Sequence, residues 1–327
     1  MIETALILAA GLGTRLAPLS ALRAKAALPV AGEALIRHQV RWLAAAGVRR
    51  ITVNLHHLPA TITAVLGNGE DLGVCVRYSW EPRVLGSAGG PRQAFDLLDT
   101  DQLIVVNGDT ITDLDLSALA AEHARLEPLV TMAAARTSRP GYNALLVNHA
   151  GCLTGVARAG EASTPLAPNL HPAHFIGVQV VERRAFAEAP KGMPSETVKW
   201  LYPHLVAADP ACVRVWPCDA SFFDVGTPAD YLRTVQSLAA RYGRPLDRGE
   251  GAQVDPTSDV TGSILWQDVR IGAGASVRHC VVGDGVVVAP GTQWSRATVV
   301  RRDSQPPGAP GVAQGDLLVV PFDAATT

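Results

Sequence analysis

The sequence predicts an α/β fold, with a doubly wound parallel sheet followed by a short parallel β-helix. Short apolar runs alternate with helical patterns between residues 5 and 107, which favours strands joined by crossover helices. Aliphatic residues then recur in steps of six, five and six from Ile271 to Val288, with glycines between them. That spacing is typical of hexapeptide repeats. A pair of antiparallel hairpins is the alternative interpretation.

The elements of the first half follow from the apolar runs and their ends. The run 5–10 is continuous and stops at Gly11, which suits a strand buried on both faces. The elements expected after it are helix 35–46, strand 51–55, helix 59–66, strand 74–78, helix 88–98 and strand 103–107. Because ligands bind at the carboxyl ends of such strands, the loops 11–15 and 108–109 are candidate site loops.

The second half is less regular. Its expected strands are 129–135, 144–147, 175–181 and 213–217, and its expected helices are 196–206 and 228–241. Thr227 and Pro228 form a helix start, and Gly243 a helix stop. We expect a catalytic domain at 1–243, a linker at 244–259 and the β-helix at 260–302, with a tail at 303–327 that is mostly loop.

Composition restricts the class of protein. The 327 residues are 48% apolar and carry a net charge of −2, which excludes intrinsic disorder and gives no electrostatic basis for binding nucleic acid or an anionic membrane. The five cysteines are scattered, without a CxxC pair, as in reduced proteins. No apolar stretch reaches the length of about 20 residues that a membrane span needs. We therefore expect a soluble, cytoplasmic protein.

The glycine turn after the first strand presents backbone N–H groups to an anion. It fits neither of two familiar motifs, because Leu16 stands where GxGxxG needs glycine and the Gly-Lys-Ser/Thr end of the Walker A motif is absent. The chain has three lysines, Lys25, Lys191 and Lys199. Lysine at position 25, close after this loop, therefore indicates a specific need for an ammonium group.

Four blocks of sequence carry a family resemblance. LAAGLGTRLAPL at 8–19, followed by Lys25 and LPVAG at 28–32, resembles the signature of the sugar nucleotidyltransferases, or nucleoside-diphosphate-sugar pyrophosphorylases. EPRVLGSAGG at 81–90, VVNGD at 105–109 and FDVGTP at 223–228 resemble three further family motifs in the right order. The nearest subgroups are mannose-1-phosphate guanylyltransferase-like and N-acetylmuramate-1-phosphate uridylyltransferase-like proteins.

The resemblance implies a Rossmann-like mixed sheet of the nucleotide-diphospho-sugar transferase type, with a left-handed β-helix. It also implies a reaction in which a sugar 1-phosphate attacks a nucleoside triphosphate and releases pyrophosphate. Arg15 would hold the leaving phosphates and Lys25 the phosphates on the attacking side, while Asp109 and Asp224 would hold Mg²⁺. Taken alone, each of the two aspartates could equally be a turn residue.

The resemblance also assigns binding residues. The nucleotide-binding candidates are Ala10, Gly11, Gly13, Thr14, Gly86, Ser87, Ala88 and Asn107. The sugar-binding candidates are Asn143, Gly177, Glu196 and Lys199. For Glu196 a structural interpretation is equally strong, because Ser195 could cap a helix with Glu196 in its first turn.

The pattern departs from the family on the sugar-phosphate side. Many members carry Glu-Lys-Pro where this chain has residues 153–160, so Arg158 or Lys199 would have to supply the cation. A non-catalytic sugar-nucleotide sensor is therefore a second hypothesis. Acyl transfer by the repeats is a weak third, because the β-helix is short and His279 is its only histidine. The expected partners are a nucleoside triphosphate, a sugar 1-phosphate and, through the β-helix, a second copy.

Overall fold

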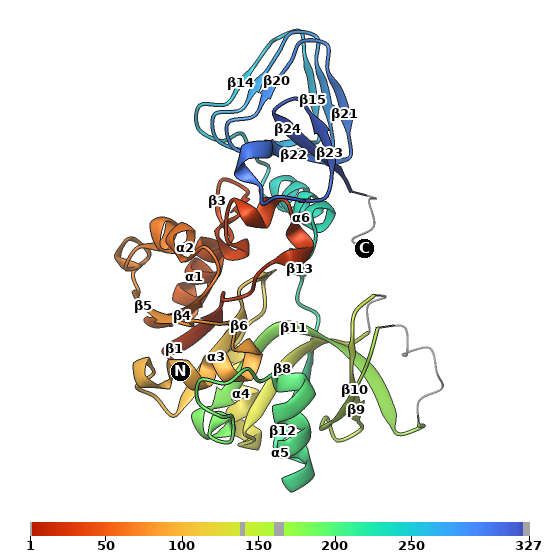
Figure 1. Cartoon of the computed structure of the whole chain (residues 1–327). Helices are drawn as coiled ribbons and strands as arrows, with labels where there is room; N and C mark the ends of the chain where they lie inside the picture. Colours follow the sequence, from red (N-terminus) through yellow and green to blue (C-terminus); the bar gives the residue numbers. More distant parts are fainter. Residues whose placement is uncertain (1, 138–140, 160–166, 323–327) are drawn as a thin grey trace. The chain divides into compact units, whose positions relative to one another are not determined.

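The computed structural model describes residues 2–137, 141–159 and 167–322 (Figure 1). Its internal contacts divide the chain into two units. The first unit comprises Met1–Gly11, Gln39–Pro59 and Leu66–Phe223. The second comprises Leu12–His38, Ala60–Val65 and Asp224–Thr327. This division differs from the expected boundary at residue 243, because the segment after the glycine turn groups with the C-terminal part of the chain.

The first unit is built on a mixed sheet, as predicted. Its described strands form a nine-stranded sheet with the path β10-β9-β11-β6-β1-β4-β5, extended by β8 on β11 and β12 on β8. The parallel half consists of β1 (Thr4–Leu8), β4 (Arg50–Leu55), β5 (Cys75–Trp80) and β6 (Gln102–Asn107). The other half consists of β8 (Val130–Ala135), β9 (Ala144–Asn148), β10 (Leu153–Ala157), β11 (Leu170–Glu182) and β12 (Val213–Cys218).

The strand β11 makes the sheet mixed, because it runs antiparallel to β6, β8 and β9. The apolar faces of β6, β8 and β11 contribute to one buried cluster, which includes Val105, Met132 and Phe186. The small sheet of β7 (Thr110–Thr112) and β13 (Phe222–Asp224) follows the carboxyl end of β6. Asp224, the last residue of β13, already belongs to the second unit.

Except for the helix at Leu116–Leu126, which was not predicted, the described helices lie close to the expected positions. They are α1 (Leu35–Ala45), α2 (Pro59–Leu66), α3 (Gly86–Ala94), α4 (Leu116–Leu126), α5 (Tyr202–Ala208) and α6 (Pro228–Arg241). The predicted start of α6 is confirmed: Thr227 and Asp230 form a reciprocal capping box with proline at the first position. The predicted helix 88–98 ends instead in a 3₁₀ turn, Phe95–Leu97.

The helix expected at 196–206 is interrupted. Residues Thr197–Leu201 form one turn of π-helix, in which the Leu201 N–H donates to the Glu196 carbonyl, and α5 follows. Pro203 stands in the first turn of α5 and has no N–H to continue the earlier register. Single π turns occur frequently at functional sites.

The second unit contains the predicted parallel β-helix. Its described coils stack three strands deep on three faces: β14 (Gln253–Val254), β17 (Arg270–Ile271) and β20 (Val287–Val288); β15 (Asp259–Thr261), β18 (Ser276–Arg278) and β21 (Gln293–Ser295); β16 (Ile264–Leu265), β19 (Val281–Val282) and β22 (Ala297–Arg301). Equivalent positions lie 17 residues apart. The aliphatic residues that predicted the repeat, Ile271, Val277, Val282 and Val288, are all buried in its core.

The β-helix extends further than expected at both ends. The strand β14 falls within the segment expected as a linker, because one aliphatic residue among turn residues is enough to form a side of a coil. The expected loop tail contains β23 (Val312–Gln314) and β24 (Leu317–Pro321), and β24 pairs antiparallel with β22. Burial of Leu318 and Val319 accounts for this strand.

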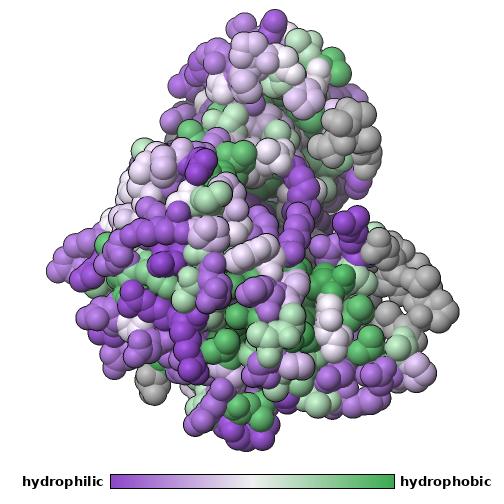
Figure 2. All heavy atoms as spheres, turned by 60° about the horizontal axis from the view of Figure 1, so that its bottom comes forward, coloured by the Kyte–Doolittle hydropathy of each residue, from purple (hydrophilic) through white to green (hydrophobic). Residues whose placement is uncertain are grey.

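The surface carries few large apolar side chains. The most exposed ones in the described chain include Trp80 and Met193 in the first unit and Val287 and Val312 in the second. On the face drawn in Figure 2, hydrophobic residues form small patches among hydrophilic ones. None of the helices in the described part of the chain is long and apolar enough to cross a membrane.

Candidate active site

The predicted site turn at 108–109 lies beside the carboxyl end of β1, the strand that leads into the other predicted site loop. The Gly108 N–H donates to the Leu8 carbonyl at 2.9 Å, and a Cβ atom on Gly108 would lie 2.6 Å from that oxygen. Glycine therefore allows the turn that carries Asp109 to pass directly beside the end of β1. Gln39 holds the same turn, donating to the Asn107 carbonyl at 2.7 Å and to the Thr110 carbonyl at 2.8 Å.

Gly177 in β11 lies opposite this turn. A Cβ atom there would be 2.5 Å from the Thr110 hydroxyl and 3.2 Å from the Asn107 Cβ, and the residue has a φ of 81°. Both features require glycine. The structure thus brings Asn107 and Gly177 together beside the turn of Asp109.

A buried hydrogen-bonded pair joins two segments of the first unit that precede predicted nucleotide-binding residues. Asn54 accepts from the Ala9 N–H at 2.6 Å and donates to Glu81 Oε1 at 2.7 Å. Glu81 Oε2 accepts from the Leu85 N–H at 2.9 Å. The Asn54–Glu81 pair therefore ties the residues before Ala10 and Gly11 to the residue before Gly86.

Glu81 is fully buried, and burial raises the pKa of its carboxyl group, while the hydrogen bonds from Leu85 and Asn54 act in the opposite direction. Neither residue was predicted as part of the site. The available signals were Glu81 at the start of the block 81–90 and the polar Asn54 near the end of strand β4.

The start of α3 is packed against residues 195–197. A Cβ atom on Gly86, which has a φ of 75°, would lie 2.7 Å from both Glu196 Oε1 and the Ser195 carbonyl oxygen. The N–H groups of Ala88 and Gly89 both donate to that carbonyl, at 2.9 and 3.1 Å. The small residues at positions 86–89 are thus required by the close approach of a second chain segment.

Ser87 joins this contact through its hydroxyl. Its Oγ donates to Glu196 Oε2 at 2.8 Å and accepts from the Thr197 N–H at 2.9 Å. Glu196 has extended backbone angles before the π turn and makes no side-chain cap hydrogen bond, so it does not occupy the first helical turn of the structural interpretation. The predicted nucleotide residue and the predicted sugar residue are in direct contact.

Three of the four sugar-binding candidates line one pocket. The pocket has a volume of about 320 Å³ and lies entirely in the first unit. Its lining comprises Ser87, Asn143, Glu196 and Lys199 with Tyr142, Leu145, Val156, His174, Phe175 and Val198. Gly177 does not line it. Lys199 does and Arg158 does not, so of the two candidate replacements for the missing family lysine, the pocket favours Lys199.

One wall of this pocket is aromatic. The ring of His174 stacks on Phe222 with centroids 5.1 Å apart and meets Tyr142 edge-on at 5.0 Å. The lining also includes Glu196 and Lys199. A lining that combines aromatic rings with charged groups suits a ligand with an apolar face and several hydroxyl or phosphate groups.

The second unit contains the remaining candidates. Gly13 has a φ of 63°, and a Cβ atom there would lie 3.8 Å from the Cβ of Lys25, so the glycine turn folds back beside the lysine. Arg15 is exposed in the 3₁₀ turn Thr14–Leu16. Arg15 and Asp224 flank Gly226: a Cβ atom on that glycine would lie 3.6 Å from both the Arg15 Nη1 and the Asp224 Oδ2.

The donor chemistry fits Mg²⁺. Within residues 2–137, 141–159 and 167–322, no three carboxylate, imidazole or thiol groups gather in a way that could hold an ion by themselves. Mg²⁺ is commonly bound by one or two carboxylates, with substrate phosphates and water as the other ligands. The carboxylates of Asp109, in the first unit, and Asp224, in the second, each have the oxygen chemistry of a Mg²⁺ ligand.

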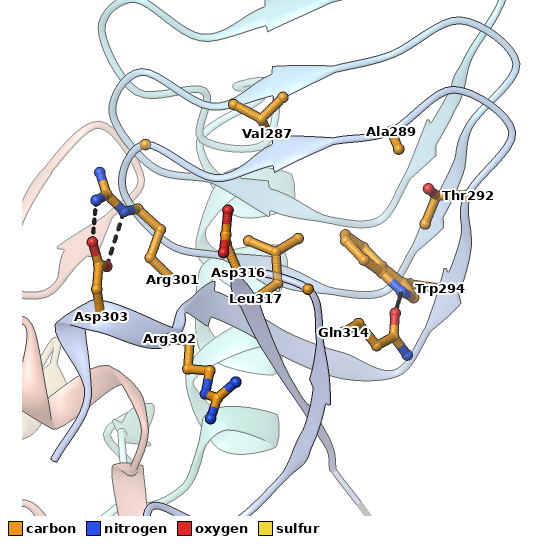
Figure 3. Close-up of a pocket in the computed structure, with 12 residues that line it drawn as sticks. Val287, Ala289, Thr292, Trp294, Arg301, Arg302, Asp303, Gln314, Asp316 and Leu317 are labelled. Carbon is orange, nitrogen blue, oxygen red and sulfur yellow. Dashed lines mark hydrogen bonds and ion pairs between the residues drawn. The ribbon is translucent and has the colours of Figure 1, made fainter. Parts of the chain in front are cut away.

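A larger groove, of about 870 Å³, lies on the β-helix (Figure 3). Figure 3 shows Val287 and Leu317 between the Arg301–Asp303 ion pair on one side and Trp294 on the other. The Trp294 Nε1 donates to Gln314 Oε1 at 3.1 Å. None of the predicted catalytic, nucleotide, metal or sugar residues lines this groove.

Known protein families and proteins are similar to this chain. Residues 4–142 match the nucleotidyl transferase family model, and residues 249–296 match the GlmU-like C-terminal hexapeptide model. The mannose-1-phosphate guanylyltransferase of Mycobacterium tuberculosis is 30% identical over 304 residues, covering 88% of this chain and 81% of that protein. The N-acetylmuramate alpha-1-phosphate uridylyltransferase of Neisseria meningitidis is 44% identical over 115 residues, which is 35% of this chain and half of that protein.

A solved structure supports the fold. HddC from Yersinia pseudotuberculosis superposes with a TM-score of 0.61 at 21% identity, covering 72% of this chain and all of that one. The chain therefore belongs to the sugar nucleotidyltransferase family, and both the predicted family and the predicted fold class are confirmed. Its class of activity is that of a sugar-1-phosphate nucleotidyltransferase, with a nucleoside triphosphate and a sugar 1-phosphate as substrates.

Replacing Gly90 by alanine tests the buried pair. The new Cβ would lie 2.6 Å from Asn54 Nδ2 and 2.7 Å from Glu81 Oε1, so it must displace a buried hydrogen bond. We expect Gly90→Ala to lower the free energy of unfolding by about 1–3 kcal/mol, measured by urea denaturation. Gly155→Ala is the control, because its Cβ meets a single side-chain atom at 3.8 Å. Equal stability of the two variants would contradict this packing.

Proposed function

We propose that the protein transfers a guanylyl group from GTP to mannose 1-phosphate, giving a nucleotide-linked mannose and pyrophosphate. The observation that carries this choice is the breadth of the Mycobacterium tuberculosis match, which extends over 88% of the chain. A second mannose-1-phosphate guanyltransferase, from Yarrowia lipolytica, matches 80% of the chain at 28% identity.

The reaction needs positioning and charge neutralisation rather than a protein nucleophile. A phosphate oxygen of the sugar 1-phosphate forms a bond to the α-phosphorus of the nucleotide, and the bond from that phosphorus to the bridging oxygen of the β-phosphate breaks. Pyrophosphate leaves with the electron pair. The attacking oxygen is already anionic, so no general base is required. Both substrates are polyanions, and their approach therefore depends on cationic groups.

Arg15 and Lys25 supply these cations in our proposal. The planar guanidinium of Arg15 can donate two parallel hydrogen bonds to the oxygens of the leaving β- and γ-phosphates. The compact ammonium of Lys25 would hold phosphate oxygens on the attacking side. Asp109 and Asp224 would hold Mg²⁺, which supplies further neutralisation of phosphate charge when it is bound.

The pocket of about 320 Å³ is the proposed sugar site. This volume is at the lower end of the range for ligand pockets, about 300–1,000 Å³, and suits a single sugar ring. Glu196 and Asn143 would bind hydroxyl groups, and Lys199 would bind the sugar phosphate in place of the missing family lysine. The contact of Ser87 with Glu196 would link the sugar site to the nucleotide site at α3.

A uridylyltransferase acting on N-acetylmuramate 1-phosphate is the second candidate. It is favoured by the higher identity, 44% over 115 residues, to the Neisseria meningitidis relative. That match covers about a third of this chain. It is therefore weaker support for a particular nucleotide and sugar than the matches that cover most of the chain.

Pyrophosphate release in a matrix of substrates tests the proposal. Each common nucleoside triphosphate is combined, with Mg²⁺, with the 1-phosphates of mannose, glucose, N-acetylglucosamine and N-acetylmuramate. We expect the highest kcat/KM for GTP with mannose 1-phosphate, and a loss of at least about 100-fold in Asp109→Asn and Asp224→Asn. Asp96→Asn, at an exposed ion pair with Lys191, is the control and should keep full activity.

The alternatives give distinct results in the same matrix. Turnover with UTP and N-acetylmuramate 1-phosphate would replace the main proposal by the second candidate. Nucleotide-sugar binding without turnover in any combination would contradict both and favour a sensor. Full turnover in the two aspartate variants would contradict the proposed metal site.

Gly11→Ala separates a nucleotide role from a structural role. A Cβ atom on Gly11 meets no atom within 4 Å, and the residue is exposed, so we expect the stability of the fold to be unchanged. If the backbone at Gly11 approaches phosphates, the same Cβ should raise the KM for the nucleoside triphosphate about tenfold or more. A KM equal to that of wild type, measured in steady-state kinetics, would show that phosphates do not approach this residue.

A further inference from the structure

We infer that the β-helix contributes to catalysis by positioning Lys25, because residues of its first two coils hold the segment that carries this lysine. This inference rests on the proposed function, in which Lys25 binds phosphate. The contacts all lie within the second unit, which joins residues Leu12–His38 to the C-terminal part of the chain. They form two anchors, one on each side of the lysine.

The first anchor is Arg23, two residues before Lys25. Its Nη2 donates to both carboxylate oxygens of Asp284, at 2.8 and 2.9 Å, and to Gln267 Oε1 at 3.1 Å. Its guanidinium lies 4.8 Å from the ring centre of Trp266. The Arg23 side chain is 19% exposed and that of Asp284 36%, so this ion pair is partly shielded from water.

Asp284 is itself held in place by the coil. Its Oδ1 also accepts from the Gln267 N–H at 3.0 Å, one coil earlier in the β-helix. The neighbouring Gly283 packs against Leu22, where a Cβ atom would lie 3.2 Å from the leucine side chain. Asp284 therefore belongs to one coil of the β-helix, and its carboxylate is hydrogen-bonded to the coil before it. This restrains its position and, through it, the position of Arg23.

The second anchor is Pro29, four residues after Lys25. Its carbonyl accepts from the hydroxyl of Tyr231 in α6 at 2.5 Å, and that hydroxyl in turn accepts from the Trp266 Nε1 at 3.2 Å. Tyr231 and Trp266 are both buried. The same tryptophan therefore contacts Arg23 through its ring and reaches Pro29 through Tyr231.

Between the anchors the chain has little freedom. Residues Lys25–Ala27 form a single 3₁₀ turn, and the Ala24 N–H donates to the Thr61 hydroxyl at 3.1 Å. A displacement of the turn by about 1 Å is enough to lower the rate of a positioned reaction about 100-fold. Arg23, Asp284 and Trp266 are thus positioning residues that act through Lys25.

The test is Asp284→Asn, compared with Asp259→Asn. Asp259 forms an ion pair with Arg278 on another face of the same β-helix, so it is a matched control. We expect Asp284→Asn to lower kcat/KM for the sugar 1-phosphate about 10- to 100-fold with an unchanged melting temperature. Asp284→Glu keeps a carboxylate and should recover much of the loss. Asp259→Asn should behave as wild type.

A second readout does not depend on activity. Because Lys25, Lys191 and Lys199 are the lysines of this chain, acetylation by acetic anhydride followed by peptide mass analysis reports on each one separately. We expect the rate of Lys25 labelling, relative to exposed Lys191, to change at least about threefold in Asp284→Asn and to be unchanged in Asp259→Asn.

The outcomes are distinguishable. Absence of turnover in the wild-type protein would contradict the proposed function. A change of Lys25 labelling in Asp284→Asn would still show that Asp284 positions the Lys25 segment. Unchanged kcat/KM in Asp284→Asn overturns the inference and leaves the proposed function intact. Reduced kcat/KM with unchanged Lys25 labelling, or a loss equal to that of Asp259→Asn, also overturns it, because the effect would then not act through the lysine.

Discussion

The hydroxyl of Tyr231 is the contact on which the second unit depends. It donates to Pro29, in the segment after the glycine turn, and accepts from Trp266, in the first coil of the β-helix. Burial raises the pKa of this phenol, so it stays protonated and able to donate at any physiological pH. One side chain of α6 therefore joins three stretches that are far apart in sequence. Together with the bond of Arg23 to Asp284, it joins Leu12–His38 to the C-terminal part of the chain.

The first unit depends on a comparable buried pair. Asn54 and Glu81 satisfy backbone N–H groups at the end of β1 and before α3, where the chain leaves regular structure. Together with the contact of residues 195–197 on α3, this pair sets the positions of the loops proposed to bind nucleotide. The pocket proposed to bind the sugar includes Ser87 and Glu196 of this contact in its lining. In our proposal, the loops for the nucleotide and the pocket for the sugar are therefore held by hydrogen bonds of the same part of the first unit.

The features predicted correctly from the sequence are those that a local residue pattern encodes. Helices α2 and α6 lie at the predicted residues, and the aliphatic steps of the β-helix identified its core. The gathering of Asn143, Glu196 and Lys199 followed from the family resemblance. The bond of Arg23 to Asp284 and the Asn54–Glu81 pair were not predictable, because each joins distant residues without a local pattern. The strands β14 and β24 were missed. Each is short, with two and five paired residues, and forms because it stacks on or pairs with a neighbouring strand rather than through the β-propensity of its own residues.

Hydrogen exchange in Tyr231→Phe tests most directly whether the C-terminal part holds the Lys25 segment. The variant keeps the buried ring and removes the hydroxyl. The account predicts faster exchange at the Ala27 and Leu28 amides, which close the turn at Lys25, with unchanged protection in β1 and β6. Unchanged exchange at Ala27 and Leu28 would contradict it. An equal loss of protection in β1 and β6 would contradict it as well, because the hydroxyl would then support the whole fold rather than this segment.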